Sequence, residues 1–226
     1  MELFLANNAD SMQFEAIKLW LRKYMDGSVS SKMAHNGLGY RINYGVSIVH
    51  IRRYSSEIIA SPQLALRLWN SDIRECMLLA TLLLNPNVSN EVLLSLRDKI
   101  TNIELAEQFG FNFGYKLDHP AKTLLTWLDH DNEFVRISAI LSISTFLQKG
   151  LKEDEDALQI FFLASKAVEL SSVSLQRTLI RLLTQLLKVD GYLLDIQCLM
   201  NEWKFGVDLE RMAVADEILI EIEYAK

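Results

Sequence analysis

Two carboxylates and a scattered set of arginines are the side chains in this sequence whose types and spacing could do chemistry. Glu104 and Glu107 stand three residues apart, so a helix would place them on nearly the same side. Solvated acids in the first turn of a helix also complement its dipole, and that role needs no ligand. We favour the structural role for Glu104. For Glu107, the structural role and a role in a functional site both stay open.

The arginines allow two interpretations as well. Arg136 lies near the start of a strongly apolar predicted helix, where an ion pair with an acid and a contact to a phosphate are equally compatible with its position. The adjacent pair Arg52 and Arg53 either contacts a ligand or forms a solvated helix face. A further set with spacings of four and seven residues could track a phosphate backbone or face solvent, namely Arg177, Arg181 and Lys188.

Helices must position these side chains, because apolar residues recur at intervals of three and four and no strand-like alternation interrupts them. Short amphipathic helices with tight polar breaks occupy the stretch 64–113. We expect Asn70-Ser71, Ser89 and Asn102 to provide caps there. Further helices are expected at 11–25, 30–36, 48–59, 120–128, 133–148, 158–170, 172–188, 191–203 and 207–224.

Pairs of helices in units of roughly 35–45 residues predict an all-α fold of HEAT-like helical repeats, an α-solenoid. A compact helix bundle without repeats is the competing architecture. We expect a single helical-repeat domain over 1–226, which is long enough to bury a sizeable core. Trp20, Trp69 and Trp127 are expected to pack between helices rather than to form a stacking platform.

Composition narrows the function classes. Hydrophobic residues make up 50% and charged residues 23% of the chain, as in ordinary globular proteins. The apolar runs are too short to cross a bilayer, and the N-terminus lacks the features of a signal peptide, so we expect a cytoplasmic protein without a membrane partner. Cys76, Cys198 and the four histidines show no ligand spacing. With no dinucleotide, phosphate-loop or zinc motif either, we expect no metal and no cofactor.

Net charge is −6, which argues against a nonspecific coat of nucleic acid. The first 60 residues nevertheless carry 7 basic and 5 acidic side chains. A local basic face is therefore compatible with the sequence, whereas an overall positive field is not.

Three strings occur in a fixed order along the chain: YGVSIVHIRRYSSEI, LALRLWNSDIRECMLLATLL and NEFVRISAI. Together they resemble the DNA alkylation repair family of alkylpurine glycosylases (AlkD type), which are built from HEAT-like helical repeats. The similarity spans the range 44–188. In this comparison the first string resembles the family's Tyr-Gly-Val entry loop, the second its Leu-Trp-x-Ser junction, and the third the helix that carries an active-site arginine.

The resemblance implies cleavage of the N-glycosidic bond of a cationic alkylated purine in duplex DNA. In such enzymes a carboxylate stabilises the developing sugar cation or positions the water. Tryptophans and an arginine hold the sugar and phosphates of the damaged nucleotide. The base need not enter a deep pocket, unlike in most base-flipping enzymes.

Carried over residue by residue, the family pattern is only partly present. Its Trp-Asp-x-x-Asp motif falls on a segment where Ile103 replaces the tryptophan, Glu104 the first acid and Glu107 the catalytic aspartate. Arg136 matches the family's arginine, whereas Arg181 or a neighbour stands in place of the second tryptophan. Glutamate reaches one methylene further than aspartate, so the geometry of the site would change.

Two functions follow as hypotheses. The first is a repair-type protein that binds duplex DNA carrying alkylated bases and excises them with Glu107 beside Arg136 on the inner wall of the solenoid. Its backbone contacts would be Arg52, Arg53, Arg177, Arg181 and Lys188. The second is a non-catalytic scaffold of the same fold that binds DNA or a protein partner, which the acidic net charge and the missing tryptophans favour.

Overall fold

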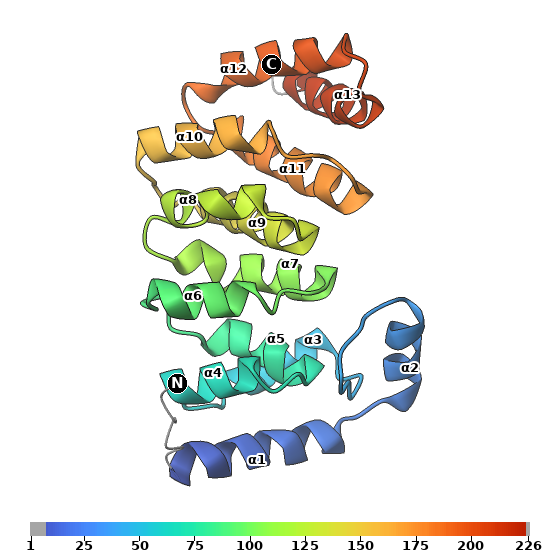
Figure 1. The fold of residues 1–226 in the computed structure, drawn as a ribbon, viewed down its shortest axis with the longest axis vertical. Helices are drawn as coiled ribbons and strands as arrows, with labels where there is room; N and C mark the ends of the chain where they lie inside the picture. The colour runs from blue at the N-terminus through green and yellow to red at the C-terminus, as the bar shows by residue number, and fades with distance from the viewer. Residues whose placement is uncertain (1–7, 225–226) are drawn as a thin grey trace. The chain divides into compact units, whose positions relative to one another are not determined.

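This computed structural model describes residues 8–224, which form a series of helices joined by loops (Figure 1). Within that range no strand forms, and the β contact present is an isolated bridge between Ile42 and Ile73. The predicted all-α fold is therefore confirmed. The chain divides into two compact units, Met1–Phe113 and Gly114–Lys226. The expected single domain over 1–226 stays a prediction.

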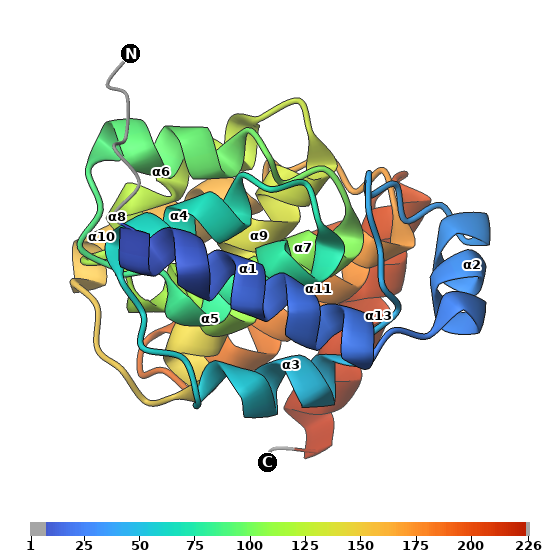
Figure 2. The same ribbon diagram turned by 90° about the horizontal axis from the view of Figure 1, so that it is seen from below.

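In the first unit α5 contacts three other helices, namely α3, α4 and α7. α4 packs in addition on α1. α2 stands to one side of this unit in both views and has no buried residue (Figures 1 and 2). The helices are α1 (Asn8–Lys23), α2 (Gly27–His35), α3 (Ile48–Ser55), α4 (Pro62–Trp69), α5 (Arg74–Leu83), α6 (Asn90–Arg97) and α7 (Ile103–Asn112).

The second unit is built around α9 and α11, which pack on each other. α9 also contacts the short elements before it, and α11 contacts α13, which in turn packs on α12. The elements are the 3₁₀ helix η1 (Gly114–Lys116), α8 (Pro120–Thr123), the 3₁₀ helix η2 (Leu125–Asp129), α9 (Glu133–Gln148), α10 (Glu155–Ser165), α11 (Val173–Leu186), α12 (Tyr192–Lys204) and α13 (Leu209–Tyr224).

Serine and asparagine side chains cap many of the helix starts. Each accepts a hydrogen bond from a backbone N–H two or three residues further on, which satisfies one of the donors that a helix N-terminus leaves unpaired. These caps are Ser47 on α3, Ser61 on α4, Ser89 on α6, Asn102 on α7, Asn132 on α9 and Ser172 on α11. The predicted caps Ser89 and Asn102 are therefore confirmed.

One local prediction is confirmed and one is wrong. Asn70 caps the end of α4, whereas α5 begins after Ile73 without a side-chain cap. Instead the N–H of Arg74 donates to the carbonyl oxygen of Ile42 at 2.9 Å, so the bridge to the preceding loop replaces the cap. The single helix expected over 120–128 is the short α8 followed by η2.

Large aromatic side chains fill the core of each unit. Trp69, Phe109 and Phe113 are fully buried in the first unit, and Trp127 is buried in the second. The ring centroid of Phe109 lies 6.1 Å from that of Trp69 and 5.1 Å from that of Phe113. Burying one such side chain contributes about 1.5–3 kcal/mol. The predicted packing of Trp69 and Trp127 is confirmed.

Trp20 also packs between helices, but at the surface of the first unit. Its ring is half-buried and stacks on Tyr54, with centroids 4.0 Å apart and planes 2° apart. Tyr24 extends this contact, with its centroid 4.6 Å from that of Trp20. The stack joins the C-terminal half of α1 to α3.

Gly45 occupies a position in the loop before α3 that no other residue would fit. Its φ is +72°, and an added Cβ would meet the carbonyl oxygen of Asp26 well inside contact distance and lie 2.9 Å from the backbone N of Ser30. We expect Gly45→Ala to lower the free energy of unfolding by about 2 kcal/mol, because the left-handed conformation is strained for alanine and the backbone must shift. Urea unfolding measures the change.

Gly39→Ala is the matched control for this prediction. Gly39 lies in the same loop without a positive φ, and an added Cβ there would meet nothing within 4 Å. We expect its effect to stay within about 0.5 kcal/mol. Equal effects at Gly39 and Gly45 would contradict a close backbone approach at Gly45.

Candidate functional site

Glu104 belongs to a buried ion network. Arg74 Nε and Nη2 donate to Glu104 Oε2 and Oε1 at 2.8 and 2.5 Å. Arg74 Nη1 donates in addition to Glu75 Oε1 at 2.9 Å. The side chains of Arg74 and Glu75 are 1% and 0% exposed, and that of Glu104 is 13% exposed. The predicted solvated role of Glu104 is therefore wrong, because an arginine 30 residues earlier in the chain neutralises its carboxylate.

The same network fixes the loop between α2 and α3. The backbone N–H groups of Tyr44 and Val46 donate to Glu75 Oε2 and Oε1 at 3.0 and 3.1 Å. Arg74 Nη1 also donates to the carbonyl oxygen of Val46 at 2.9 Å. A buried carboxylate needs several donors in place of water, and these groups supply them to Glu75. These buried hydrogen bonds attach the loop to the start of α5.

Tyr40 completes the network on the side of α7. Its hydroxyl lies 3.1 Å from Asn102 Oδ1 and 3.2 Å from Glu104 Oε2. Burial, together with the charge of Glu104, raises the pKa of Tyr40 well above its usual range. Burial lowers the pKa of Arg74, but the hydrogen bond and charge of Glu104 outweigh it, so that the pKa of Arg74 is raised. Glu104 therefore serves the fold rather than a substrate.

Glu107, by contrast, is half-buried and lies further along α7. The next residue, Gln108, accepts hydrogen bonds at its Oε1 from Arg52 Nη2 at 3.4 Å and from Asn112 Nδ2 at 3.1 Å. Arg52 is exposed on α3, as is Arg53. The structure thus brings Arg52 to the part of α7 that carries Glu107, within the first unit.

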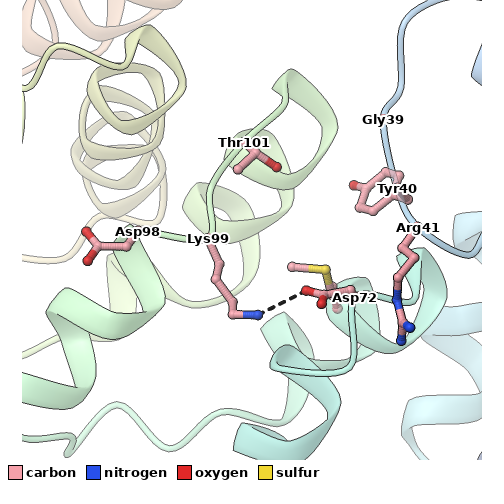
Figure 3. A pocket seen from close by; sticks show the side chains of 8 residues that line it. Gly39, Tyr40, Arg41, Asp72, Asp98, Lys99 and Thr101 are labelled. Atoms are coloured by element: carbon pink, nitrogen blue, oxygen red, sulfur yellow. Dashed lines mark hydrogen bonds and ion pairs between the residues drawn. The ribbon is translucent and has the colours of Figure 1, made fainter.

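A pocket of about 250 Å³ opens beside the ion network (Figure 3). Its charged side chains are Arg41, Asp72, Asp98 and Lys99, and Lys99 Nζ lies 2.9 Å from Asp72 Oδ1. Two acids and two bases balance each other there, so the charge of the pocket favours neither an anion nor a cation. We assign it no ligand.

Arg136 is half-buried near the start of α9, between the fully buried side chains of Val135 and Ile137. Its Nε is buried and has no hydrogen-bond partner among the described residues. A buried donor without a partner costs about 1–3 kcal/mol. Glu107 and Arg136 belong to different units, and their pairing stays a prediction.

The cations expected on one face of α11 do not form a single stripe. Arg177 is exposed, whereas Arg181 is half-buried and its Nη2 donates to Gln148 Oε1 at the end of α9, at 2.6 Å. α11 ends at Leu186, so Lys188 lies beyond the helix. The prediction that Lys188 continues the helix face of the two arginines is therefore wrong.

A family model described as DNA alkylation repair enzyme matches residues 17–172, well over half of the chain. The chain belongs to the DNA alkylation repair enzyme family. The matched range includes the Arg74 network, Glu107 and Arg136, and it ends before Arg177. No curated protein matches the chain.

A solved structure supports the fold of this DNA alkylation repair family member. It is described as a new family of proteins related to the HEAT-like repeat DNA glycosylases with affinity for branched DNA structures. The TM-score is 0.66 at 12% sequence identity, over 91% of this chain and 83% of the other. The predicted HEAT-like helical-repeat fold is therefore confirmed.

Three features of the described part of this DNA alkylation repair family member concern membranes, metals and cysteine chemistry. None of its helices there has the length and apolar character needed to cross a membrane. Among the same residues, no three side chains of His, Cys, Asp or Glu are grouped as metal ligands. Burial raises the pKa of the Cys76 thiol to about 12, so this cysteine stays protonated and is no nucleophile.

Sequence reasoning missed the two residues at the centre of the ion network. Arg74 and Glu75 are adjacent charged residues at the start of an otherwise apolar helix, IRECMLLATLL. Charged residues are rarely fully buried unless they are paired. Two adjacent charged residues in an apolar helix were therefore the sequence signal for a buried ion pair. The partners could not be read from the sequence, because Glu104 and the loop amides lie far from them along the chain.

Proposed function

We propose that this chain binds DNA through its arginines. Its membership of the DNA alkylation repair family and its likeness to a DNA-glycosylase-related structure support DNA as the partner. Because net charge is −6, binding would depend on local groups of cations rather than on a general positive field. The proposed backbone contacts are Arg52 and Arg53 in the first unit, and Arg136, Arg177, Arg181 and Lys188 in the second.

The observation that carries this proposal is the position of Arg136, which is half-buried near the start of α9 and matches the arginine of the family pattern. Its Nε has no hydrogen-bond partner among the described residues, so this atom gives no support to the competing interpretation of Arg136 as a structural ion pair. Phosphate oxygens are strong acceptors that match the planar guanidinium, so a DNA phosphate suits the solvent-exposed part of this half-buried side chain.

Arg136→Gln is expected to weaken binding to duplex DNA about tenfold and to lower the salt dependence of binding by about one phosphate contact. Fluorescence anisotropy with labelled DNA over a series of salt concentrations measures both. The free energy of unfolding should hardly change, since no hydrogen bond of Nε is lost. Lys152→Gln, at an exposed cation of the same unit, is the matched control. Equal affinities of Arg136→Gln and this control would remove Arg136 from the interface.

Branched DNA is the form that we propose the chain prefers. The structural relative is described as having affinity for branched DNA structures, and the proposal carries that property over to this chain. The test is a competition between a four-way junction and a linear duplex built from the same arm sequences. Tighter binding of the junction supports the proposal, and equal binding contradicts it.

Excision of a cationic alkylated purine is a second candidate function. Two observations favour it: Glu107 is half-buried rather than hidden in the core, and Arg52 reaches the neighbouring Gln108. A carboxylate in that position could stabilise the positive charge that develops on the sugar. Release of N7-methylguanine from alkylated duplex DNA is the direct assay.

A non-catalytic scaffold is the alternative. Two observations favour it. Ile103 stands in place of the family's tryptophan, and Glu104 is paired with Arg74. Binding of DNA without excision would support a DNA-binding scaffold. A partner whose binding does not depend on salt would instead indicate a protein surface, because phosphate contacts are salt-dependent. A cytoplasmic location stays a prediction.

A further inference from the structure

Positively charged side chains line a second cleft in the first unit. This cleft of about 440 Å³ is lined by one side of α1, by the loop between α2 and α3, and by the end of α4. The charged side chains in its lining are Lys18, Arg22, Arg41 and Arg67. Its lining includes no carboxylate, although the chain as a whole carries more acids than bases.

Two of these cations are held in place by uncharged groups. Arg67 Nη1 donates to Ser11 Oγ at 2.9 Å, and its guanidinium lies 4.4 Å from the ring centroid of Phe14. Arg41 Nη2 donates to the carbonyl oxygen of Ser71 at 3.3 Å. These contacts orient the guanidinium groups without neutralising them. Each therefore keeps its full charge and further donors for a ligand.

The other two cations come from α1. Lys18 and Arg22 are one helical turn apart on the side of α1 that faces the cleft. Lys18 Nζ lies 2.8 Å from Glu15 Oε1, a pair on the same helix whose acid is largely exposed. Such exposed pairs are weak and easily exchanged. Arg41 also lines the neighbouring pocket with Asp72 and Asp98. With Arg41 left out and Glu15 counted, the cleft keeps an excess of two positive charges, so its chemistry selects an anion.

The cleft is separate from the proposed contact at Arg52. Its lining comes from α1, α4 and the residues around them, whereas Arg52 lies on α3 and contacts Gln108 on α7. We propose that this cleft binds the phosphodiester backbone of a second arm of branched DNA. The inference rests on the proposed function, because it takes the first arm to lie along α3 and α7. Guanidinium groups from several elements suit a backbone whose phosphates follow one another at regular spacing.

The test uses the full chain with the double substitution Arg22→Gln and Arg41→Gln. Both side chains are exposed, so the variant should fold with an unchanged free energy of unfolding. We expect its affinity for a four-way junction to fall about tenfold and the salt dependence to drop by about two phosphate contacts. Affinity for a linear duplex should stay within about twofold, since one arm can still bind at Arg52.

The matched control replaces two cations of the same unit outside the cleft, Lys32→Gln with Arg97→Gln, and changes net charge by the same amount. It should leave the preference for the junction intact. If the cleft variant loses affinity for the junction and the duplex equally, or for neither, the second-arm inference is overturned while DNA binding stands. If the wild-type chain binds neither DNA, the proposed function itself has failed, and the inference with it.

A small phosphate compound is the alternative ligand of this cleft, and it must be distinguished from a DNA arm. Inorganic pyrophosphate is the probe, and the melting temperature of the protein is the readout. If pyrophosphate raises the melting temperature of the wild type but not of the cleft variant, and the variant binds the junction normally, the cleft belongs to a small ligand. That result would overturn the assignment to a DNA arm.

Discussion

Arg74→Met is expected to lower the free energy of unfolding by about 3–5 kcal/mol, because it leaves two buried carboxylates without the guanidinium that neutralises them. Glu75 would keep its two backbone donors, whereas Glu104 would keep only the hydroxyl of Tyr40. Methionine fills a similar volume, so the loss reflects charge rather than a cavity. Urea unfolding followed by tryptophan fluorescence measures the change.

Lys99→Met provides the control for Arg74→Met. Lys99 pairs with Asp72, but the two side chains are 33% and 51% exposed, and we expect a loss of at most about 1 kcal/mol. A second comparison adds Glu104→Gln to Arg74→Met, which should recover part of the stability because one buried charge is removed with its partner. Equal losses for Arg74→Met and Lys99→Met would contradict a structural role for the network.

Glu107→Gln is expected to abolish any release of N7-methylguanine by this chain, with a loss of about a hundredfold or more. Glutamine keeps the size of glutamate but carries no negative charge to stabilise the sugar cation. The measurement is single-turnover release of the base from duplex DNA that contains the lesion, with enzyme in excess. DNA binding by the variant should persist, since a carboxylate makes no favourable contact with phosphates.

Glu91→Gln, at an exposed acid on α6, is the matched control for Glu107→Gln. It removes the same charge from the same unit, and full activity is expected. Glu107→Asp tests geometry, because it restores the shorter acid of the family pattern. Equal release by the wild type and Glu107→Gln would exclude Glu107 from the mechanism. No release by the wild type would leave DNA binding without chemistry as the function.

Local signals account for the parts of the fold that could be predicted from the sequence. Serine and asparagine caps with apolar residues at helical spacing gave correct starts for helices such as α6 and α7, because both signals act over a few residues. The prediction missed the bridge from Ile42, which completes the first turn of α5 from a distant loop. It also failed over 120–128, where His119 in the left-handed conformation starts only a short helix.

The candidate site was harder to predict, since its residues meet through long-range contacts. The sequence singled out Arg52, Glu107 and Arg136 through a resemblance, and the structure adds the contact between Arg52 and Gln108. The sequence could not show that Glu104 pairs with Arg74, because helix periodicity places a residue on a helix face but does not identify its partner. The cations of the cleft come from three separate segments and have no common spacing.

The attachment of the loop before α3 to the carboxylate of Glu75 has a consequence for binding. A recognition loop that becomes ordered only when its target binds loses affinity to that ordering. Here the amides of Tyr44 and Val46 are already bonded to a buried acid, and Gly45 between them fits closely against α2. A ligand that meets Arg41 on this loop would find a preformed surface, so little affinity would be lost to ordering the backbone.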